Sequence, residues 1–429
     1  MIGKIISYAL LEKQKMASPE SIRKLQLRKI KEITSYAYHN VPFYTKKFDI
    51  AGMRPEDINS FKDLEKIPLT TKEELKKAGD CIISKEHTKE ELYTSRTSGS
   101  QGLPFTSYFD KNAWNTLKYA SKLRARSACG QRLGARIVNI ETYDKNQVEE
   151  LNHTAKNSFF NIKYLSIFDD IENHITFLES FKPDVLYGLA SYFLELGRIM
   201  MEMNLHWNEN TLIFTSGEML DVSTKKKLRM YFGNNVFDVY GSTELKEVAW
   251  ECKEHKGYHI NDDLYYVEFV EKKGCEDFEL VITSFVNKAM PLIRFSLGDH
   301  GRKLEEKCKC GLAFSMLTPM QGRDVDYFLL PDDRLVSPYM LTMSVEPIKS
   351  IFQYKIIQHS KEFVEFMVVL EKTGNEAISR TFEETIDEVK MKLGSVLGKD
   401  VCIQVTLCSR IPLGNNGKYR IVESMVKRK

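Results

Sequence analysis

Four short apolar runs, separated by stretches with helical spacing, constrain the fold of this chain more than any other feature. The runs are Arg136 to Ile140, Val185 to Gly188, Leu212 to Thr215 and Val236 to Tyr240. Short apolar and β-branched runs between helical segments are typical of buried parallel strands. The sequence therefore predicts an α/β fold with a parallel sheet across about residues 110–240.

Different patterns flank this region. Residues 18–45 place apolar side chains at helical spacing after Ser18-Pro19-Glu20, and Pro42 is expected to end that helix. From about residue 257 to 330 the pattern becomes strand, turn and strand, which predicts a β-rich antiparallel region. Its clearest strands run from Tyr265 to Val270 and from Phe278 to Ser284.

The C-terminal part predicts a small, mobile α+β domain. Its expected elements are strands at Ile356 to Gln358, Phe363 to Leu370 and Val401 to Leu407, and a helix from Glu376 to Leu397. We place the domain boundary at Arg323. The expected large domain then covers residues 1–322, with a β-rich subdomain at about 245–322, and the small domain covers 323–429.

The overall charge is close to neutral, because 62 Lys and Arg residues balance 59 Asp and Glu residues. Nothing global therefore favours binding to nucleic acid, and the run Lys225-Lys226-Lys227 is interpreted as solvated surface. No apolar run approaches the roughly 18 residues that a membrane-spanning helix needs. The stretch from Ile5 to Leu11 is followed at once by Glu12 and Lys13, which predicts an amphipathic surface helix rather than a signal peptide. We expect a cytoplasmic protein without a membrane partner.

Hydroxyl residues and glycines are concentrated between Thr97 and Pro104. Glycine lets backbone N–H groups approach an anion closely, and hydroxyl groups add further donors. Such a segment can hold a polyphosphate, which indicates ATP. The same composition is also typical of a flexible turn.

Four further motifs contain residues that could complete a nucleotide site. Tyr240-Gly241-Ser242-Thr243-Glu244 follows an apolar strand and offers an aromatic ring for a base, a hydroxyl for a phosphate and a carboxylate for Mg²⁺. Gly298-Asp299 could present a carboxylate to a ribose, and Gly322-Arg323-Asp324-Val325-Asp326 could be a charged hinge. Lys418 lies on a Gly- and Asn-rich loop, from which it could reach a phosphate or a carboxylate. Each motif alone is equally typical of a turn, a linker or an exposed loop.

Together, the order and spacing of these motifs resemble the adenylate-forming superfamily of acyl-CoA synthetases and adenylation domains. Within it, the likeness is greatest to the phenylacetate–coenzyme A ligase group, including its relatives from capsule and secondary-metabolite clusters. The resemblance covers nearly the whole chain. It includes the segments Tyr36 to Tyr44, Pro183 to Gly188, Thr215 to Glu218 and Ile351 to Gln358.

The resemblance implies that ATP and Mg²⁺ activate a carboxylic acid, giving an acyl-adenylate and pyrophosphate before the small domain rotates and the acyl group is transferred. Both reactants are anions, so cations must offset their repulsion. By this likeness Lys418 neutralises charge during adenylation, Thr243 binds the α-phosphate and Glu244 binds Mg²⁺. The other implied nucleotide contacts are Thr97, Ser98, Gly99, Ser100 and Gly102 at the β,γ-phosphates, Asp238 and Tyr240 at adenine, Asp299 and Arg323 at the ribose, and Gly217, Glu218, Gly241 and Ser242.

The sequence departs from the pattern of the family in the phosphate loop and at the hinge. Gln101 stands where a Thr is usual, and no Lys follows Gly102. Val325 stands where an Asp commonly follows the Gly-Arg-x triplet of the hinge. These departures put the phosphate contacts and the pivot in doubt.

A zinc site is predicted around the turn Cys308-Lys309-Cys310-Gly311. Cys252 lies upstream, and thiolate and imidazole ligands suit tetrahedral Zn²⁺. From Cys252, spacing alone favours His255 as the fourth ligand. Relatives with this turn tend to have Gly-Leu-His at Gly257-Tyr258-His259, so the resemblance implies His259, with His255 in reserve. Four protein ligands would make the zinc structural; the alternative is reduced surface thiols.

The acid and its acceptor remain open at this level. Tyrosines and small residues near the strand ends would suit a flat aromatic acid, which is a hypothesis for the substrate. The expected acceptor is coenzyme A or the phosphopantetheine of a carrier protein, with an amine as the alternative that would make the enzyme an amide-forming ligase. A non-catalytic nucleotide-binding or scaffold protein is the alternative from another class, and a homodimer is conceivable.

Overall fold

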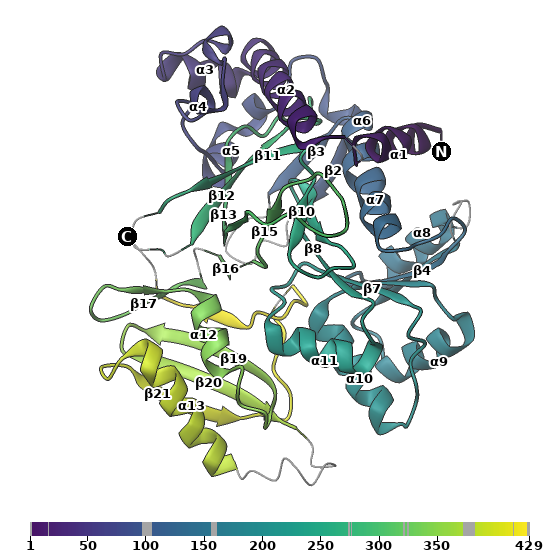
Figure 1. The fold of residues 1–429 in the computed structure, drawn as a ribbon, viewed down its shortest axis with the longest axis vertical. Coiled ribbons are helices and arrows are strands. Elements are labelled where there is room, and N and C mark those ends of the chain that lie inside the picture. Colours follow the sequence, from purple (N-terminus) through teal and green to yellow (C-terminus); the bar gives the residue numbers. More distant parts are fainter. Residues whose placement is uncertain are drawn as a thin grey trace.

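The computed structural model describes residues 2–15, 17–96, 105–155, 161–272, 275, 277–320, 322–323, 326–371, 382–414 and 416–426. The described strands form two large sheets in residues 1–323 and a separate smaller sheet near the C-terminus. Figure 1 shows this smaller part as a distinct lobe, joined to the larger part on one side. The predicted α/β class with a small α+β domain is confirmed.

Short helices make up the N-terminal region. They are α1 (Ile2–Lys15), α2 (Pro19–Asn40), α3 (Pro42–Ile50), α4 (Phe61–Leu64) and α5 (Lys72–Ala78), with single turns at Pro55–Asp57, Gly79–Ile82 and Lys89–Glu91. The start of α2 agrees with the sequence, because the Ser18 hydroxyl accepts a hydrogen bond from the Ser21 N–H at 3.2 Å. Pro42 ends α2 as predicted, but it also begins α3, where a missing N–H is harmless.

The main sheet carries the predicted parallel strands. Its order is β14-β15-β10-β9-β8-β7-β6-β4-β5, with parallel pairing from β8 to β5 and antiparallel pairing from β14 to β8. The strands are β4 (Arg136–Glu141), β5 (Asn161–Ser166), β6 (Val185–Gly188), β7 (Leu212–Ser216), β8 (Val236–Ser242), β9 (Lys246–Glu251), β10 (Tyr258–Ile260), β14 (Lys303–Leu304) and β15 (Met316–Leu317). All four predicted strands are present, and β5 was not predicted.

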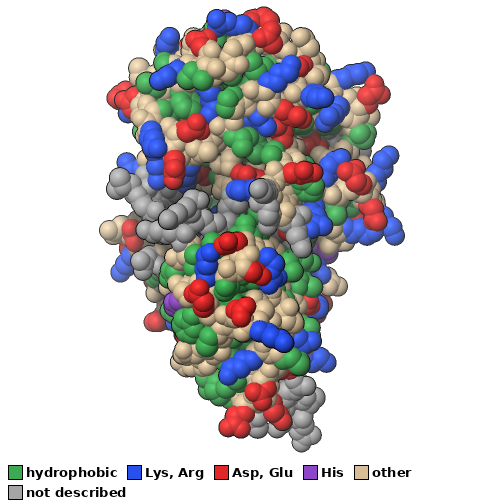
Figure 2. Space-filling view, turned by 90° about the vertical axis from the view of Figure 1, so that its left-hand side faces the viewer, with side chains coloured by type: hydrophobic (Ala, Val, Ile, Leu, Met, Phe, Trp, Pro, Cys, Tyr) green, Lys and Arg blue, Asp and Glu red, His purple; other side chains and the backbone are tan. Residues whose placement is uncertain are grey.

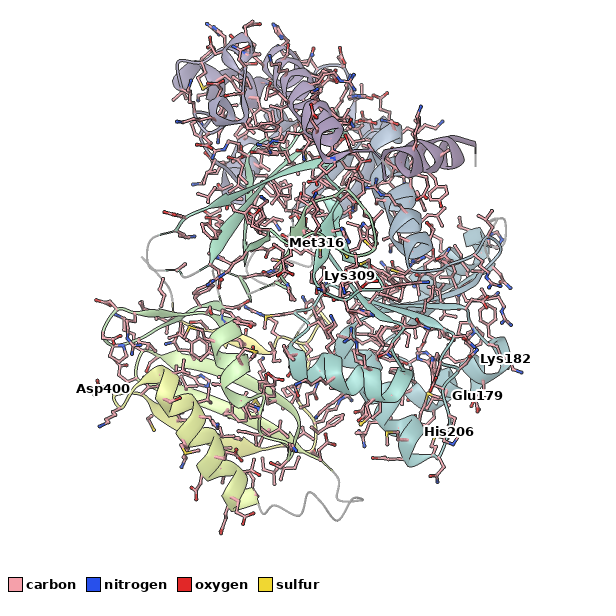
Figure 3. All side chains as sticks on the ribbon, viewed as in Figure 1. Glu179, Lys182, His206, Lys309, Met316 and Asp400 are labelled. Atoms are coloured by element: carbon pink, nitrogen blue, oxygen red, sulfur yellow. The ribbon has the colours of Figure 1, made fainter. Side chains whose placement is uncertain are left out.

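Helices accompany this sheet. They are α6 (Lys111–Ala113), a π-helical stretch (Trp114–Ala120), α7 (Ser121–Ala128), α8 (Lys145–Ala155), α9 (Ile171–Phe181), α10 (Ala190–Glu202) and α11 (Val222–Phe232). Asp221 caps α11 by accepting hydrogen bonds from the N–H groups of Ser223 and Thr224. Lys182 and His206, which precede β6 and β7, lie at the outer edge of the molecule, whereas Asp400 marks the opposite, small domain (Figure 3).

The second sheet is the predicted antiparallel region. Its order is β1-β13-β12-β11, and β16 pairs with a later part of β13. The strands are β1 (Thr70–Thr71), β11 (Tyr265–Val270), β12 (Phe278–Ser284), β13 (Phe295–Gly301) and β16 (Gly322–Arg323), and β2 (Tyr93–Arg96) pairs separately with β3 (Thr106–Phe109). The region expected to be one subdomain at 245–322 thus divides its strands between two sheets.

The small domain has its own sheet and its own core. The sheet order is β21-β20-β19-β22, and Ile356, Val364, Phe366, Val389 and Leu393 are buried together within the domain. The elements are β17 (Phe328–Leu329), β18 (Leu335–Val336), α12 (Pro338–Val345), β19 (Ile351–Ser360), β20 (Phe363–Leu370), α13 (Phe382–Leu397), β21 (Cys402–Leu407) and β22 (Val422–Ser424). The predicted start of α13 at Glu376 lies outside the described residues.

The lysine run on α11 corrects one expectation. Lys225 forms an ion pair with the buried Glu251, and Lys227 donates hydrogen bonds to the backbone carbonyls of Ile351 and Phe352 in the small domain. Only Lys226 is largely exposed, although it also pairs with Glu346. The run is therefore not simply solvated surface, because it links α11 to the small domain.

The molecular surface fits the balanced composition. Figure 2 shows acidic and basic side chains mixed over both lobes, with no broad patch of one sign on that face. The helices of the described residues include none with the length and apolar character to cross a membrane.

Candidate active site

Several of the predicted residues lie at one edge of the main sheet, where the parallel strands β4, β6, β7 and β8 end. Parallel strands bring their carboxyl ends to the same edge, which is the usual place of a ligand site in such sheets. Glu141 ends β4, Gly217 and Glu218 follow β7, and Tyr240 to Glu244 lie at the end of β8. The C-terminal segment with Lys418 reaches this edge from the small domain.

Glu218 connects the two domains at this edge. Its carboxylate accepts hydrogen bonds from the N–H and hydroxyl of Ser191, at the start of α10, both at 2.9 Å. It also accepts one from the N–H of Tyr419, at 2.6 Å. Burial raises the pKa of Glu218, while these hydrogen bonds and the nearby Lys418 oppose that shift. Glu218 therefore holds the segment around Lys418 against the large domain.

The ammonium group of Lys418 lies over Gly217. A Cβ on Gly217 would come within 2.9 Å of the Lys418 Nζ, and Gly217 itself has a φ of +83°. Burial lowers the pKa of Lys418, and the negative charge of Glu218 partly offsets this. A glycine is thus required both by the backbone conformation and by the space that the lysine occupies.

Asp299, Tyr240 and Arg323 form a second group. The buried Asp299 accepts a hydrogen bond from the Tyr240 hydroxyl at 2.8 Å and another from Arg323 Nε at 3.0 Å. Asp299 and Arg323 also face each other directly in the pairing of β13 with β16. The sequence placed these three residues at one nucleoside, and the structure brings them into contact.

Asp238 has a different setting from the one expected beside adenine. Its two carboxylate oxygens accept hydrogen bonds from the hydroxyls of Thr215, at 2.5 Å, and Tyr258, at 2.7 Å. Burial raises its pKa to about 6, against these hydrogen bonds. The carboxylate is thus engaged inside the sheet, where it links β8 to β7 and β10.

The end of β8 contains a buried carboxylate with a cationic partner. Glu244 is buried, and Lys72 Nζ lies 2.7 Å from its Oε1. Lys246 donates hydrogen bonds to the Thr243 carbonyl at 2.8 Å and to the Ser95 hydroxyl at 2.7 Å, and burial lowers its pKa to about 7. A Cβ on Gly241 would lie 2.2 Å from the Lys246 carbonyl oxygen, so this turn also needs a glycine. Ser242 supports the turn by accepting from the Leu245 N–H at 3.1 Å.

Several predicted contacts lie outside the described residues. They are Thr97, Ser98, Gly99, Ser100 and Gly102, together with Gln101, Asp324 and Val325.

The sequence reasoning missed Lys72 and Lys246. Lys246 lies only two residues beyond Glu244 and could have been suspected from that position. Lys72 comes from α5, far away in sequence, and no local signal indicated its contact with Glu244.

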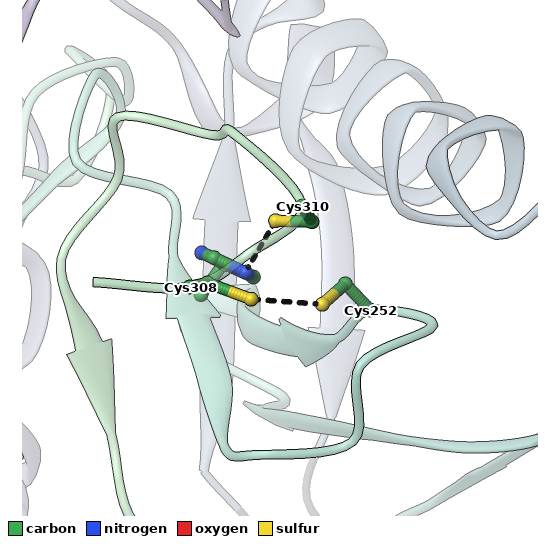
Figure 4. Close-up of side chains that lie close together, drawn as sticks. Cys252, Cys308 and Cys310 are labelled. Atoms are coloured by element: carbon green, nitrogen blue, oxygen red, sulfur yellow. Dashed lines mark hydrogen bonds between the residues drawn. The ribbon is translucent and has the colours of Figure 1, made fainter. Parts of the chain in front are cut away.

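Four predicted metal ligands converge next to β9 and β10. The Sγ atoms of Cys252, Cys308 and Cys310 and a ring nitrogen of His259 all lie within 4.8 Å of one another. Figure 4 shows two of the close contacts, Cys252 Sγ to Cys308 Sγ at 3.5 Å and Cys310 Sγ to His259 Nε2 at 3.3 Å. Three thiols and one imidazole are a donor set that suits Zn²⁺.

His255 points elsewhere. Its Nε2 lies 3.0 Å from the Asn234 carbonyl oxygen, and its ring stacks on Phe237. His259, in contrast, is fully buried on β10 beside the thiols. Of the two histidines that the sequence left open, the structure brings His259 to the cluster. Lys309, between the two cysteines of the turn, is exposed, and it lies near the middle of the view in Figure 3.

The sequence of this chain is similar to those of known proteins. A family model described as the CapK C-terminal domain matches residues 328–425. The phenylacetate–coenzyme A ligase of Aromatoleum evansii is 28% identical over 335 residues, which cover 75% of this chain and 74% of that protein. The phenylacetate–coenzyme A ligase of Escherichia coli K12 is 22% identical in an alignment that covers 98% of both chains.

A solved structure shares the fold over nearly the full length. A 2-hydroxyisobutyryl-CoA ligase in the postadenylation state, in complex with 2-HIB-AMP, superimposes with a TM-score of 0.80 at 18% identity, covering 97% of this chain and 92% of that one. The same enzyme in its thioesterification state, with CoA bound, gives a TM-score of 0.63.

Proposed function

Because this chain belongs to the phenylacetate–coenzyme A ligase-like group of the adenylate-forming superfamily and is an AMP-forming ligase, we propose that it activates a small carboxylic acid with ATP and passes the acyl group to a thiol. The acceptor is coenzyme A or the phosphopantetheine of a carrier protein. The observation that carries the proposal is the position of Lys418, held by Glu218 and Gly217 at the sheet edge that also has Glu244, Tyr240 and Asp299.

In the first step, the substrate carboxylate attacks the α-phosphate of ATP, forms an acyl-adenylate and releases pyrophosphate. Both partners are negatively charged, so a cation at the point of attack lowers the barrier. Lys418 supplies that charge, and Thr243 donates its hydroxyl to the same phosphate. Asp299 accepts the ribose hydroxyls, while Arg323 and Tyr240 fix the direction of its carboxylate. The adenine then lies along Tyr240, near Asp238, and the loop from Thr97 to Gly102 binds the β,γ-phosphates.

Magnesium would be held by Glu244 together with phosphate oxygens. The carboxylate is buried and has a cation at 2.7 Å in the form of Lys72, so the position already favours positive charge. Bound Mg²⁺ would supply neutralisation of the phosphates, and it would have to take the place of the Lys72 ammonium group. The residue types present therefore fit a single metal ligand from the protein.

Zinc would be bound by Cys252, His259, Cys308 and Cys310 and would leave no open position, so its role would be structural. It would tie the end of β9 to β10 and to the turn before β15. This proposal rests on the convergence of four ligand atoms within 4.8 Å.

In the second step, the acceptor attacks the acyl carbon of the adenylate, the new acyl bond forms and AMP leaves. With coenzyme A as acceptor, the product would be a free thioester. With a carrier protein, the product would be the covalently acylated carrier. An amine would make the enzyme an amide-forming ligase. The two TM-scores support a small domain that moves between the two steps, because one relative occupies both arrangements. We further propose a cytoplasmic location and a homodimer.

The proposed reaction is tested by measuring its products, AMP and pyrophosphate. Purified protein is incubated with ATP, Mg²⁺ and a panel of aryl, fatty, dicarboxylic and amino acids, and AMP and pyrophosphate are quantified. Without an acceptor, the proposal expects pyrophosphate with one class of acid, because the AMP stays bonded to the acyl group. When coenzyme A, a phosphopantetheinylated carrier or an amine is also present, AMP and pyrophosphate should form in equal amounts, and mass spectrometry identifies the acylated acceptor. A folded protein that binds ATP but forms neither product with any acid would instead be the nucleotide-binding alternative.

A further inference from the structure

A cluster of charged side chains surrounds the ring of Tyr187 at the end of β6. The Lys122 ammonium lies 3.6 Å from the ring centroid, and the Arg126 guanidinium lies 5.0 Å from it. Both cations come from α7, and Glu247 on β9 lies beside them. Arg126 and Glu247 are each only 6% exposed, and Tyr187 is 8% exposed. We call Lys122, Arg126 and Glu247 the charged cluster.

The charges of this cluster are poorly paired. Lys122 Nζ is 3.9 Å from Glu247 Oε1, too long for a hydrogen bond, and Arg126 Nη2 reaches only Asn139 Oδ1, at 3.4 Å. Within the described residues, Arg126 Nε and both carboxylate oxygens of Glu247 lack any hydrogen-bond partner. Burial lowers the pKa of Lys122 and Arg126 and raises that of Glu247. Buried charges without hydrogen bonds are costly unless something else compensates them.

A neighbouring ion pair on the same helix has direct hydrogen bonds. Arg124 Nη1 donates to Asp263 Oδ2 at 2.8 Å, and Arg124 also donates to the Asn261 side chain. That pair is buried and links α7 to the connection between β10 and β11. The loose geometry of Lys122 and Arg126 is therefore not a general property of this helix.

The charged cluster lies on the side of the site where the acid must bind. Glu141, at the end of β4, interacts electrostatically with Lys122 and Arg126 and also with Lys418. Lys122 also interacts electrostatically with Lys246, two residues after Glu244. In the strand register, Tyr187 on β6 lies beside Phe214 on β7, and Glu247 at the start of β9 pairs with Gly241 at the end of β8. The cluster therefore lies at the sheet edge that also carries Gly217 and Glu244, where the proposed function puts the acid.

We propose that the substrate is a carboxylic acid with a second anionic group, and that Lys122 and Arg126 bind this group. The inference rests on the proposed function. A second carboxylate would bring charge-assisted hydrogen bonds to two cations that lack them, and Glu247 would hold the Lys122 ammonium group toward it. An unsubstituted arylacetic or fatty acid would add no hydrogen bond to either Lys122, whose side chain is 28% exposed, or the buried Arg126. An acid with an ammonium group would bring a like charge next to both cations.

Matched acids separate these cases. ATP–pyrophosphate exchange is measured with butyrate, succinate and 4-aminobutyrate, and with phenylacetate, 4-carboxyphenylacetate and 4-aminophenylacetate. The inference expects the second carboxylate to raise kcat/KM in at least one series by about 10- to 100-fold, the range of one to two charge-assisted hydrogen bonds. Arg126→Met and Lys122→Met should remove most of this preference. Arg126→Lys should keep part of it, and Lys111→Met, at an exposed position before α7, should leave it unchanged.

These measurements distinguish failure of the inference from failure of the proposed function. Preference for an uncharged or ammonium-bearing acid that persists in both Met variants overturns the inference and leaves the proposed function intact. If no acid supports exchange, the proposed function fails and binding decides the inference by itself. Calorimetric titration of the wild type with succinate and 4-carboxyphenylacetate should then show binding that Arg126→Met abolishes, whereas absence of binding to the wild type overturns it. Circular dichroism of each variant checks that its fold is kept.

Discussion

The ammonium nitrogen of Lys418 lies 2.9 Å from the point that a Cβ on Gly217 would occupy, although the two residues belong to different domains. Gly217→Ala should therefore push the lysine out of place without unfolding the protein. Loss of one positioned charge at a reacting phosphate commonly reduces rates by about 10²–10³. We expect a fall of this order in the rate of acyl-adenylate formation, measured by pyrophosphate release in a single turnover.

Gly134→Ala is the matched control. Gly134 has a φ of +78°, close to that of Gly217, but a Cβ there would meet nothing within 4 Å. Both variants should lose a similar amount of stability from backbone strain, about 1–2 kcal/mol. Equal activity of the two variants would show that the position of Lys418 over Gly217 has no catalytic importance.

The carboxylate of Glu218 should be important for the contact between the domains. It accepts hydrogen bonds from Ser191 and from the N–H of Tyr419, and Gln can accept with only one oxygen. Glu218→Gln should destabilise the protein by about 1–3 kcal/mol, because a buried donor loses its acceptor. Chemical denaturation measures this. Glu195→Gln, which alters a surface ion pair on the same α10, should cost less than about 1 kcal/mol.

The zinc prediction concerns metal content and stability. Wild-type protein should contain one zinc per chain, and Cys308→Ser should lose most of it and melt at a lower temperature, because the ion ties β9 to β10. Elemental analysis and thermal denaturation measure the two effects. Cys81→Ser and His255→Ala should retain the metal, since neither residue lies in the cluster. Full zinc retention in Cys308→Ser would contradict the assignment.

Asp238 should make stability depend on pH below neutrality. Its pKa is raised from 3.8 to about 6 by burial, so the folded state binds the proton more tightly than the unfolded state. This contribution to the unfolding free energy is present at about pH 4 and is lost as the pH rises to about 6. Relative to Asp238→Asn, the wild type should lose up to about 3 kcal/mol over that range. Denaturation at a series of pH values tests this, and a flat difference would contradict it.

Much of the fold could be predicted because it depends on local pattern. Val185 to Gly188 is a strand with the bounds predicted, since the run is apolar, short and buried on both faces. β5 was missed because it lies at the edge of the sheet and includes Asn161 and Lys163, which break an apolar run. The order of strands in the main sheet, and the division of residues 245–322 between two sheets, depend on long-range pairing that no local pattern contains.

The candidate site could be predicted from the sequence only in part. Tyr240, Asp299, Arg323 and Lys418 were identified through motifs. The structure adds the contacts of Tyr240 and Arg323 with Asp299, and the position of Lys418 over Gly217. The charged cluster escaped notice, because Lys122 and Arg126 resemble ordinary solvated residues of a helix. Only the packing of α7 on the end of the sheet shows that Arg126 and Glu247 are buried without close partners. Burial of charge is a property of the assembled fold, and an isolated sequence pattern does not reveal it.

In the proposed reaction, Lys418 neutralises negative charge while the acyl-adenylate forms. The most direct measurement compares wild type and Lys418→Ala in two half-reactions, acid-dependent ATP–pyrophosphate exchange and transfer of the acyl group from preformed acyl-adenylate to the thiol acceptor. If Lys418 neutralises charge during adenylation, the rate of exchange should fall by about 10²–10³ in Lys418→Ala, while the rate of transfer from the preformed adenylate should change little. Exchange at the wild-type rate in Lys418→Ala would contradict this role of Lys418.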